Sequence, residues 1–293
     1  MHDLPRDVTI THHDIPVAVR DHGGDGPPVI LLHGLGGTVE AWDEVAPDLA
    51  HRAVAIDLRG HGHSGDGPWD WDVILDDIEV VVRHLGLGNP PLVGHSMGGM
   101  IAMRWAGRHP ECPAVVNLDG LRSAQTDPEN YPGMDPDDRD RSLTVLKGIF
   151  DGQQAAAAQP LSAEQQRATS RRSMTTRDGQ TYLRPSAELL ASLREDASFQ
   201  DAIPLLRQVT CPTLVVLSTL DPPGAEGSAL MAAHRRGVRR DLTGLPESTR
   251  VAELDASHNM VAEKPVEVAT LIREFLTAAQ SAAQEPGETS PVS

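Results

Sequence analysis

The sequence predicts an α/β fold with a doubly wound, mostly parallel β-sheet and an inserted helical lid. Short apolar runs alternate with longer segments of helical spacing, which is the order expected of β-α units. Most of these runs are continuously apolar, as in parallel strands that helices cover on both faces. Because 39% of the 293 residues are hydrophobic, the chain can bury the core of one large domain.

The strands are predicted from the apolar runs. Two shorter and more polar runs, at residues 8–11 and 16–20, come first and predict an antiparallel hairpin at the sheet edge. Six apolar runs then predict the remaining strands, at residues 28–33, 53–57, 91–95, 114–119, 213–218 and 249–255.

Two helices are predicted from the spacing of apolar residues outside these runs. Residues 69–85 carry an apolar stripe with acidic residues near its start and Gly86 after its end. Pro265 is placed to open a C-terminal helix. The last residues, 280–293, contain too few apolar side chains to pack, so we expect a disordered tail.

The alternation of strands and helices stops between Leu121 and Val209. No strand-like run occurs there, and short helical patterns are separated by Pro, Gly and Asp. Within this stretch, Ser162 and Gln165 fit a capping box at a helix start. We therefore predict a core formed by residues 1–121 and 209–279, a helical lid at residues 122–208, and a disordered tail at residues 280–293.

The composition restricts the expected partners. The formal net charge is −17 with no long Lys/Arg tract, so nucleic acids and anionic membranes would be repelled, and we expect a small-molecule substrate. Cys112 and Cys211 each precede an apolar run, which indicates buried thiols instead of a disulfide framework. The sequence has neither a leader pattern nor an apolar stretch long enough to span a membrane, so we expect a cytoplasmic protein. It carries no signal of the oligomeric state.

The most informative motif is Gly94-His95-Ser96-Met97-Gly98, which joins a predicted strand to a segment of helical composition. A serine on such a sharp turn needs small neighbours on both sides, which explains Gly94 and Gly98. The N–H group of Met97, at the helix start, can then face an oxyanion. Strand, turn and helix together predict that Ser96 is a nucleophile.

Three further segments resemble the α/β-hydrolase fold family. His33-Gly34-Leu35-Gly36-Gly37 follows the first core strand, Trp42 comes shortly after it, and Asp57-Leu58-Arg59-Gly60-His61-Gly62-His63-Ser64 follows the next strand. The resemblance covers the chain outside the lid and the tail. It implies that the N–H of Leu35 joins that of Met97 in an oxyanion hole, and that His33 supports this loop instead of carrying a proton.

A base and an acid are expected later in the sequence, in the order serine, acid, histidine. His258 follows the last predicted strand, and the resemblance places the base there and the acid at Asp221, which follows the strand at residues 213–218. The family's usual glycine near the start of the acid's turn is Ser218 here. Asp119, at the end of the strand at residues 114–119, is the alternative acid.

Other polar residues are weaker candidates. His61 and His63 have the spacing of a metal-binding pair, but no downstream cluster completes a site, so no metal is expected. The lid has six arginines, and one of them could bind a substrate carboxylate, although solvated helix faces are the preferred explanation. They are Arg167, Arg171, Arg172, Arg177, Arg184 and Arg194.

Taken together, these motifs and the resemblance imply a serine hydrolase of the carboxylic-ester type that uses no cofactor. It would cleave an ester, thioester, lactone or activated C–C bond of a small molecule through an acyl-enzyme at Ser96. A serine nucleophile disfavours the alkyl-enzyme chemistry of the family's dehalogenases and epoxide hydrolases. Two alternatives remain: acyl transfer or cofactor-free oxygenation on the same scaffold, and a ligand-binding module without catalysis.

Overall fold

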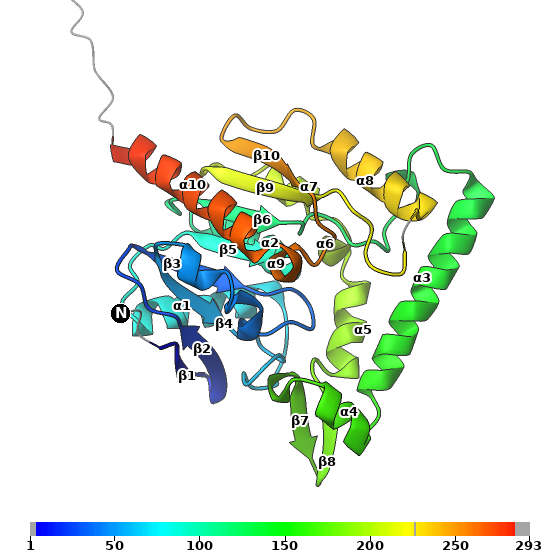
Figure 1. Ribbon diagram of the computed structural model, residues 1–293, viewed down its shortest axis with the longest axis horizontal. Coiled ribbons are helices and arrows are strands. Elements are labelled where there is room, and N and C mark those ends of the chain that lie inside the picture. Colours follow the sequence, from blue (N-terminus) through cyan, green and yellow to red (C-terminus); the bar gives the residue numbers. More distant parts are fainter. Residues whose placement is uncertain (1–3, 226, 285–293) are drawn as a thin grey trace, which may run out of the picture.

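The protein is built around an eight-stranded sheet with the strand order β1-β2-β4-β3-β5-β6-β9-β10 (Figure 1). The computed structural model describes residues 4–225 and 227–284. β1 and β2 form an antiparallel hairpin, β2 pairs antiparallel with β4, and all other neighbours are parallel. The predicted doubly wound, mostly parallel sheet and its edge hairpin are therefore confirmed. The strands are β1 (Arg6–His12), β2 (Ile15–Asp21), β3 (Pro28–Leu32), β4 (Arg52–Ile56), β5 (Leu92–His95), β6 (Val115–Leu118), β9 (Thr213–Ser218) and β10 (Thr249–Leu254).

Helices cover both faces of the sheet and create two separate apolar cores. Ile30 and Leu32 of β3 pack on one side with α1 (Trp71–His84) and α2 (Met97–Arg108). Val29 and Leu31 point to the other side, where they pack with a second set of helices. Because successive strand residues face opposite sides, a strand buried on both faces must be apolar throughout. The elements of the second side are η1 (Val39–Trp42), η2 (Ala46–Asp48), α9 (Met260–Glu263) and α10 (Pro265–Gln284).

A long insertion lies between β6 and β9, where the lid was predicted. The expectation that it contains helices only is wrong, because β7 and β8 form an antiparallel hairpin. Asp178 and Gly179 turn this hairpin with φ values of 50° and 75°, and an Asp-Gly turn is a hairpin signal that the sequence offered. The insertion contains η3 (Pro128–Asn130), α3 (Pro136–Ala157), α4 (Ala163–Ala168), η4 (Arg171–Ser173), β7 (Met174–Arg177), β8 (Gln180–Leu183), α5 (Ala187–Glu195), α6 (Ala197–Gln200) and α7 (Ile203–Leu206). Outside the insertion, helix α8 (Ala229–Asp241) follows β9.

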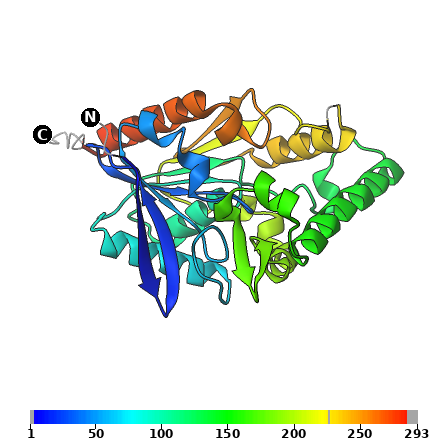
Figure 2. The same ribbon diagram turned by 60° about the horizontal axis from the view of Figure 1, so that its bottom comes forward.

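Helix α3 forms the outer edge of the insertion in both ribbon views (Figure 1 and Figure 2). Of its 22 residues only Ala157 is buried. Val145 and Ile149 are 66% and 54% exposed although they are apolar. This helix therefore contributes little to either apolar core of the sheet. The capping box predicted at Ser162 and Gln165 is present at the start of the next helix, α4.

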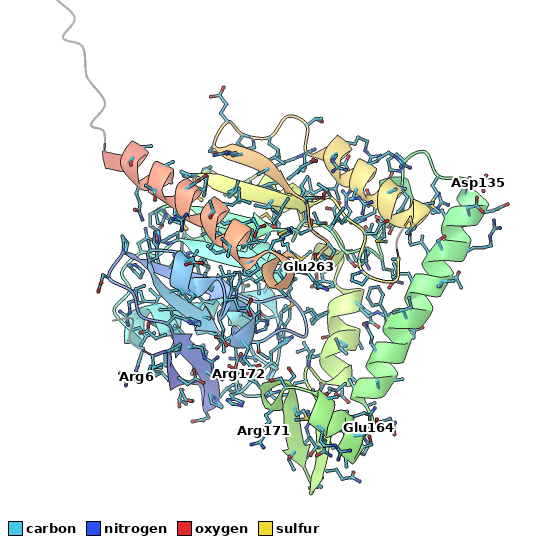
Figure 3. All side chains as sticks on the ribbon, in the orientation of Figure 1. Arg6, Asp135, Glu164, Arg171, Arg172 and Glu263 are labelled. Carbon is cyan, nitrogen blue, oxygen red and sulfur yellow. The ribbon has the colours of Figure 1, made fainter. Side chains whose placement is uncertain are left out.

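Two arginines of the insertion attach it to the core. Arg172 is buried and its guanidinium pairs with Asp57, at 2.8 Å, and with Asp7, at 2.7 Å. Figure 3 shows Arg172 where the insertion meets the N-terminal strands. Arg184 donates to the carbonyl oxygens of Gly60 and Gly62. Both arginines thus bind the turn that follows β4, which fixes one end of the insertion.

The C-terminal helix is longer than predicted. α10 begins at Pro265 as expected, but it continues to Gln284, so the expected disorder of residues 280–284 is wrong. These residues are rich in alanine and glutamine, which favour helix, and they extend a helix that is already nucleated. The rest of the predicted tail, residues 285–293, lies outside the described residues. Among the helices described, none is long and apolar enough to cross a membrane.

Candidate active site

Ser96 lies at the sharp turn between β5 and α2, as the motif predicted. Its φ of 52° and ψ of −120° are unusual for a residue with a side chain, and such strain is typical of a functional position. The two flanking glycines are required by close contacts. A Cβ atom on Gly94 would lie 2.0 Å from the carbonyl of Gly98, and one on Gly98 would lie 2.2 Å from the carbonyl oxygen of Leu32. Main-chain packing therefore holds Ser96 at this turn.

His258 connects Ser96 to a carboxylate. It lies in the loop between β10 and α9, with Nε2 3.0 Å from the hydroxyl oxygen of Ser96. Its Nδ1 is 2.8 Å from Oδ2 of Asp119, directly after β6. The network fits Nδ1–H donating to Asp119 and the Ser96 hydroxyl donating to Nε2. This is the arrangement of a nucleophile, a general base and a supporting acid.

The expectation that Asp221 supports His258 is wrong. The Asp221 carboxylate instead pairs with Arg235, at 2.6 Å, and accepts the N–H of Gly227, at 2.9 Å. The alternative acid, Asp119, contacts His258 because its backbone turns at the end of β6 with a φ of 54°. Both aspartates follow strands at the same edge of the sheet, so their positions in the sequence do not distinguish them.

Ser218 is the sequence signal that could have identified the acid. Ser218 occupies the position, near the start of the turn after β9, at which the family that the sequence resembles usually has glycine. Its backbone N–H and its hydroxyl donate to Asp119 at 3.1 and 2.9 Å. A hydroxyl at this position stabilises a carboxylate on the neighbouring strand, which a glycine could not do with a side chain. The serine that replaces the family's glycine is therefore the residue that binds Asp119.

Asp119 and His258 stabilise each other's charged forms. Burial alone would raise the pKa of Asp119, but hydrogen bonds and charge from His258, together with the two bonds from Ser218, lower it to about 2. Burial alone would lower the pKa of His258, and the hydrogen bond and charge of Asp119 outweigh this and raise it above the ordinary histidine value. Asp119 therefore stays ionised at neutral pH and stabilises the imidazolium form of His258.

Two other histidines hold the loops around Ser96. His95 Nε2 lies 2.7 Å from the carbonyl oxygen of His258. Burial, followed by the charge of His258, lowers the pKa of His95 to about 4, so the neutral ring donates this bond. His33 is buried and joins the carbonyl of Gly34 to the N–H of Leu58. Its predicted position beneath the loop is confirmed.

The expected oxyanion donors lie next to this turn. Met97 is the first residue of α2, where backbone N–H groups have no partner within the helix. The loop containing Leu35 is close to Ser96, since a Cβ atom on Gly34 would lie 3.0 Å from the Cβ of Ser96. The role of Leu35 and Met97 as oxyanion donors stays a prediction.

A cavity of about 1090 Å³ opens onto Ser96, Asp119 and His258. The insertion supplies much of its wall, and the lining is mainly apolar. Arg184 and Arg194 also line it, but each pairs with an aspartate, Asp66 and Asp151 respectively, as expected of structural arginines. Sequence reasoning missed two polar residues of this wall, Arg122 and His234. The apolar lining residues from the insertion include Leu121, Val145, Leu146, Ile149, Phe150, Leu183, Leu190 and Phe199.

The histidine pair after β4 has a structural position. His61 is buried and donates from Nδ1 to the carbonyl of Arg59 at 3.1 Å, while the backbone N–H of His63 donates to Asp57. Within residues 4–225 and 227–284, no three side chains of the metal-binding types form a cluster. The turn is held by Asp57, whose carboxylate also accepts the N–H of Val39 and pairs with Arg172.

Comparisons with known proteins identify the family. The sequence model described as "alpha/beta hydrolase fold" matches residues 27–265, so the chain belongs to the α/β-hydrolase fold family. The AB hydrolase superfamily protein YisY of Bacillus subtilis (strain 168) is 34% identical over 146 residues, which cover 47% of this chain and 54% of that protein. Fluoroacetate dehalogenase of Burkholderia sp is 27% identical over 292 residues, covering 88% of this chain and 90% of the relative.

A solved structure agrees with this assignment. Haloalkane dehalogenase DbeA from Bradyrhizobium elkani USDA94 superimposes with a TM-score of 0.65 at 20% sequence identity, covering 95% of this chain and 99% of that one. At this identity the likeness concerns the fold alone. The chain spans about half or less of the length of the first curated relatives that it matches.

Proposed function

We propose that the protein is a serine hydrolase that forms an acyl-enzyme at Ser96. The observation that carries this proposal is the position of His258, which lies 3.0 Å from the Ser96 hydroxyl and 2.8 Å from Asp119. The strained turn supports the assignment of Ser96 as the reacting group, because it presents the half-buried side chain to the cavity.

The proposed reaction begins when the Ser96 hydroxyl attacks an acyl carbonyl and His258 takes its proton at Nε2. Asp119 accepts the Nδ1–H bond throughout and stabilises the imidazolium. The N–H groups of Leu35 and Met97 stabilise the oxyanion. The leaving group departs with the proton from His258, and water then attacks the acyl-enzyme with His258 again as base.

The proposed substrate is a small molecule with an ester, thioester, lactone or activated C–C bond. An alkyl group transferred to Ser96 would form an ether, which a water molecule cannot hydrolyse as it hydrolyses an ester. Dehalogenation, the activity for which the two dehalogenases are named, is therefore not proposed for this chain. The mainly apolar wall of the cavity supports a substrate with an apolar acyl or alcohol part.

The decisive test replaces Ser96 by alanine. We expect Ser96→Ala to lose covalent labelling by a fluorophosphonate and to lower the kcat for p-nitrophenyl butyrate by about 10⁴-fold or more, as in protease triads. Ser142→Ala is the matched control, because Ser142 also lines the cavity but its hydroxyl donates to the carbonyl of Asp138 in α3. Labelling that persists in Ser96→Ala, or turnover equal to that of the control, would refute the proposal.

A further inference from the structure

Arg122 and His234 line the same cavity as Ser96, yet neither takes part in the proposed reaction. The Arg122 side chain is only 2% exposed. Its Nε and Nη1 atoms, and Nδ1 of His234, are buried without a hydrogen-bond partner among the described residues. A buried donor left without a partner is destabilising, so native proteins rarely keep several of them in one place.

The guanidinium of Arg122 is held in a fixed orientation. Its Nη2 lies 2.6 Å from Asp201 and 3.0 Å from Asp241, at the end of α8. The backbone is also fixed, because the N–H of Ser123 donates to the carbonyl of Gln200 and the N–H of Ala202 donates to that of Leu121. The two remaining donor atoms of Arg122 therefore have set positions, which is the condition for a preorganised site.

His234 is a neutral partner close to both Arg122 and the proposed active site. Burial is the largest effect and lowers the pKa of His234 to about 4, while the charges of Asp119, Arg122 and His258 act on it as well. At neutral pH its Nδ1 can therefore donate or accept a hydrogen bond, depending on the tautomer. The ring lies against Tyr131, with the centroids 6.1 Å apart.

The charges around Arg122 indicate what kind of group would complete this site. Asp241 also pairs with Arg240, at 2.6 Å, so two guanidinium groups and two carboxylates balance one another. A bound carboxylate would add an uncompensated negative charge near Asp119. An uncharged oxygen acceptor would satisfy a donor of Arg122 and change no charge.

We propose that Arg122 and His234 form a subsite that binds an uncharged carbonyl oxygen of the substrate, separate from the carbonyl that Ser96 attacks. This assignment rests on the proposed hydrolysis at Ser96 and specifies its substrate class as a compound with a second carbonyl group. The subsite binds and orients the substrate, so it acts on selectivity instead of on the reactivity of Ser96.

The test compares substrates that differ only in the second carbonyl. One series consists of p-nitrophenyl esters of straight-chain acids of increasing length, each with and without a keto group along the chain. A second series places the same keto group in the alcohol part of a simple ester, and a third replaces it by a terminal carboxylate. The measured quantity is the ratio of kcat/KM for each keto compound to that for its plain partner.

Two variants remove the donors while keeping the surroundings. Arg122→Lys retains the charge that Asp201 and Asp241 require but loses the donors of the guanidinium. His234→Phe retains the ring next to Tyr131 and loses Nδ1. Arg239→Met is the control, since Arg239 lies in α8 like His234 and lines the cavity, but its guanidinium pairs with Glu253. Thermal unfolding of each variant checks that the fold is intact.

We expect the wild-type protein to prefer at least one keto substrate, and Arg122→Lys to lower that preference about tenfold, since a hydrogen bond to a charged group contributes about 1.5 to 3 kcal/mol. His234→Phe should lower it by a smaller factor, and Arg239→Met should leave it unchanged. No keto preference in either series, or a preference that Arg122→Lys leaves intact, would refute the carbonyl subsite at Arg122. A preference for the carboxylate series would replace the neutral site by an anion site. In each of these cases plain esters are still hydrolysed, whereas failure of the proposed function would abolish their Ser96-dependent turnover.

Discussion

Helices α2 and α3 border the same cavity but are held in opposite ways. Nine of the 12 residues of α2 are buried, and the helix packs against β3, β5 and β6. Only one of the 22 residues of α3 is buried, although Val145, Leu146, Ile149 and Phe150 are apolar. The apolar side chains of α2 stabilise the fold, whereas those of α3 line the cavity.

This difference separates two tasks. Ser96 precedes α2 on a strained turn, and only a tightly packed helix and sheet can hold such a turn in place. A surface that contacts many atoms of a substrate needs apolar area, and α3 provides it without contributing much to the core. We therefore expect changes near α2 to act on reaction and stability, and changes in α3 to act on substrate choice.

The largest effect is expected at the carboxylate that contacts His258. Asp119→Asn removes the acceptor of the Nδ1 proton and favours the wrong tautomer, and the equivalent change in a serine protease lowers kcat about 10⁴-fold. Asp221→Asn should change turnover of p-nitrophenyl butyrate far less, because Asp221 pairs with Arg235. Steady-state kinetics on folded protein decide the ranking, and the reverse order would return the acid to Asp221.

A pair of isoleucines tests the contrast between the helices directly. Ile101 in α2 is fully buried, so Ile101→Ala should lower the free energy of unfolding by about 2 to 5 kcal/mol. Ile149 in α3 is 54% exposed, so Ile149→Ala should change it by less than about 0.5 kcal/mol.

The same two variants should show the opposite order in substrate choice. Ile149→Ala removes apolar contact area from the cavity wall and should lower kcat/KM for a long-chain ester relative to an acetate ester by a few-fold, since each buried CH₂ contributes about 0.8 kcal/mol. Chemical denaturation and a chain-length series measure the two effects. Equal destabilisation by both variants, or an unchanged chain-length profile in Ile149→Ala, would contradict the division of tasks.

The smallest effect is a shift in the pH profile. His258 must be neutral to take the Ser96 proton, so activity should rise with pH through the pKa of His258, and Asp119 places that midpoint above the ordinary histidine value of about 6.5. Asp119→Asn removes the bond and charge that raise this pKa and leaves the burial that lowers it, so the midpoint of its residual activity should move to lower pH. Asp221→Asn should leave the midpoint in place, and a midpoint below 6 in the wild type would refute the assignment.

The sequence by itself determined the parts whose signals are local. Continuous apolar runs predicted the buried strands, because a strand covered on both faces cannot alternate in polarity. Gly94 and Gly98 predicted the turn at Ser96, because any side chain there would overlap the main chain. His258 and both aspartates were also found, since Asp119 ends a predicted strand and the other two lie in the loops that follow predicted strands.

Only the tertiary structure decided which of these residues meet. Asp119 and Asp221 both lie at the carboxyl edge of the sheet. Which of them contacts His258 depends on the backbone turn at Asp119 and on the ion pair between Asp221 and Arg235. Arg122 and His234 are far apart in the sequence and belong to no motif, so nothing local indicated that both line the cavity. The outward position of α3 was equally hidden, because an apolar stripe on a helix has the same spacing whether it faces a core or a cavity.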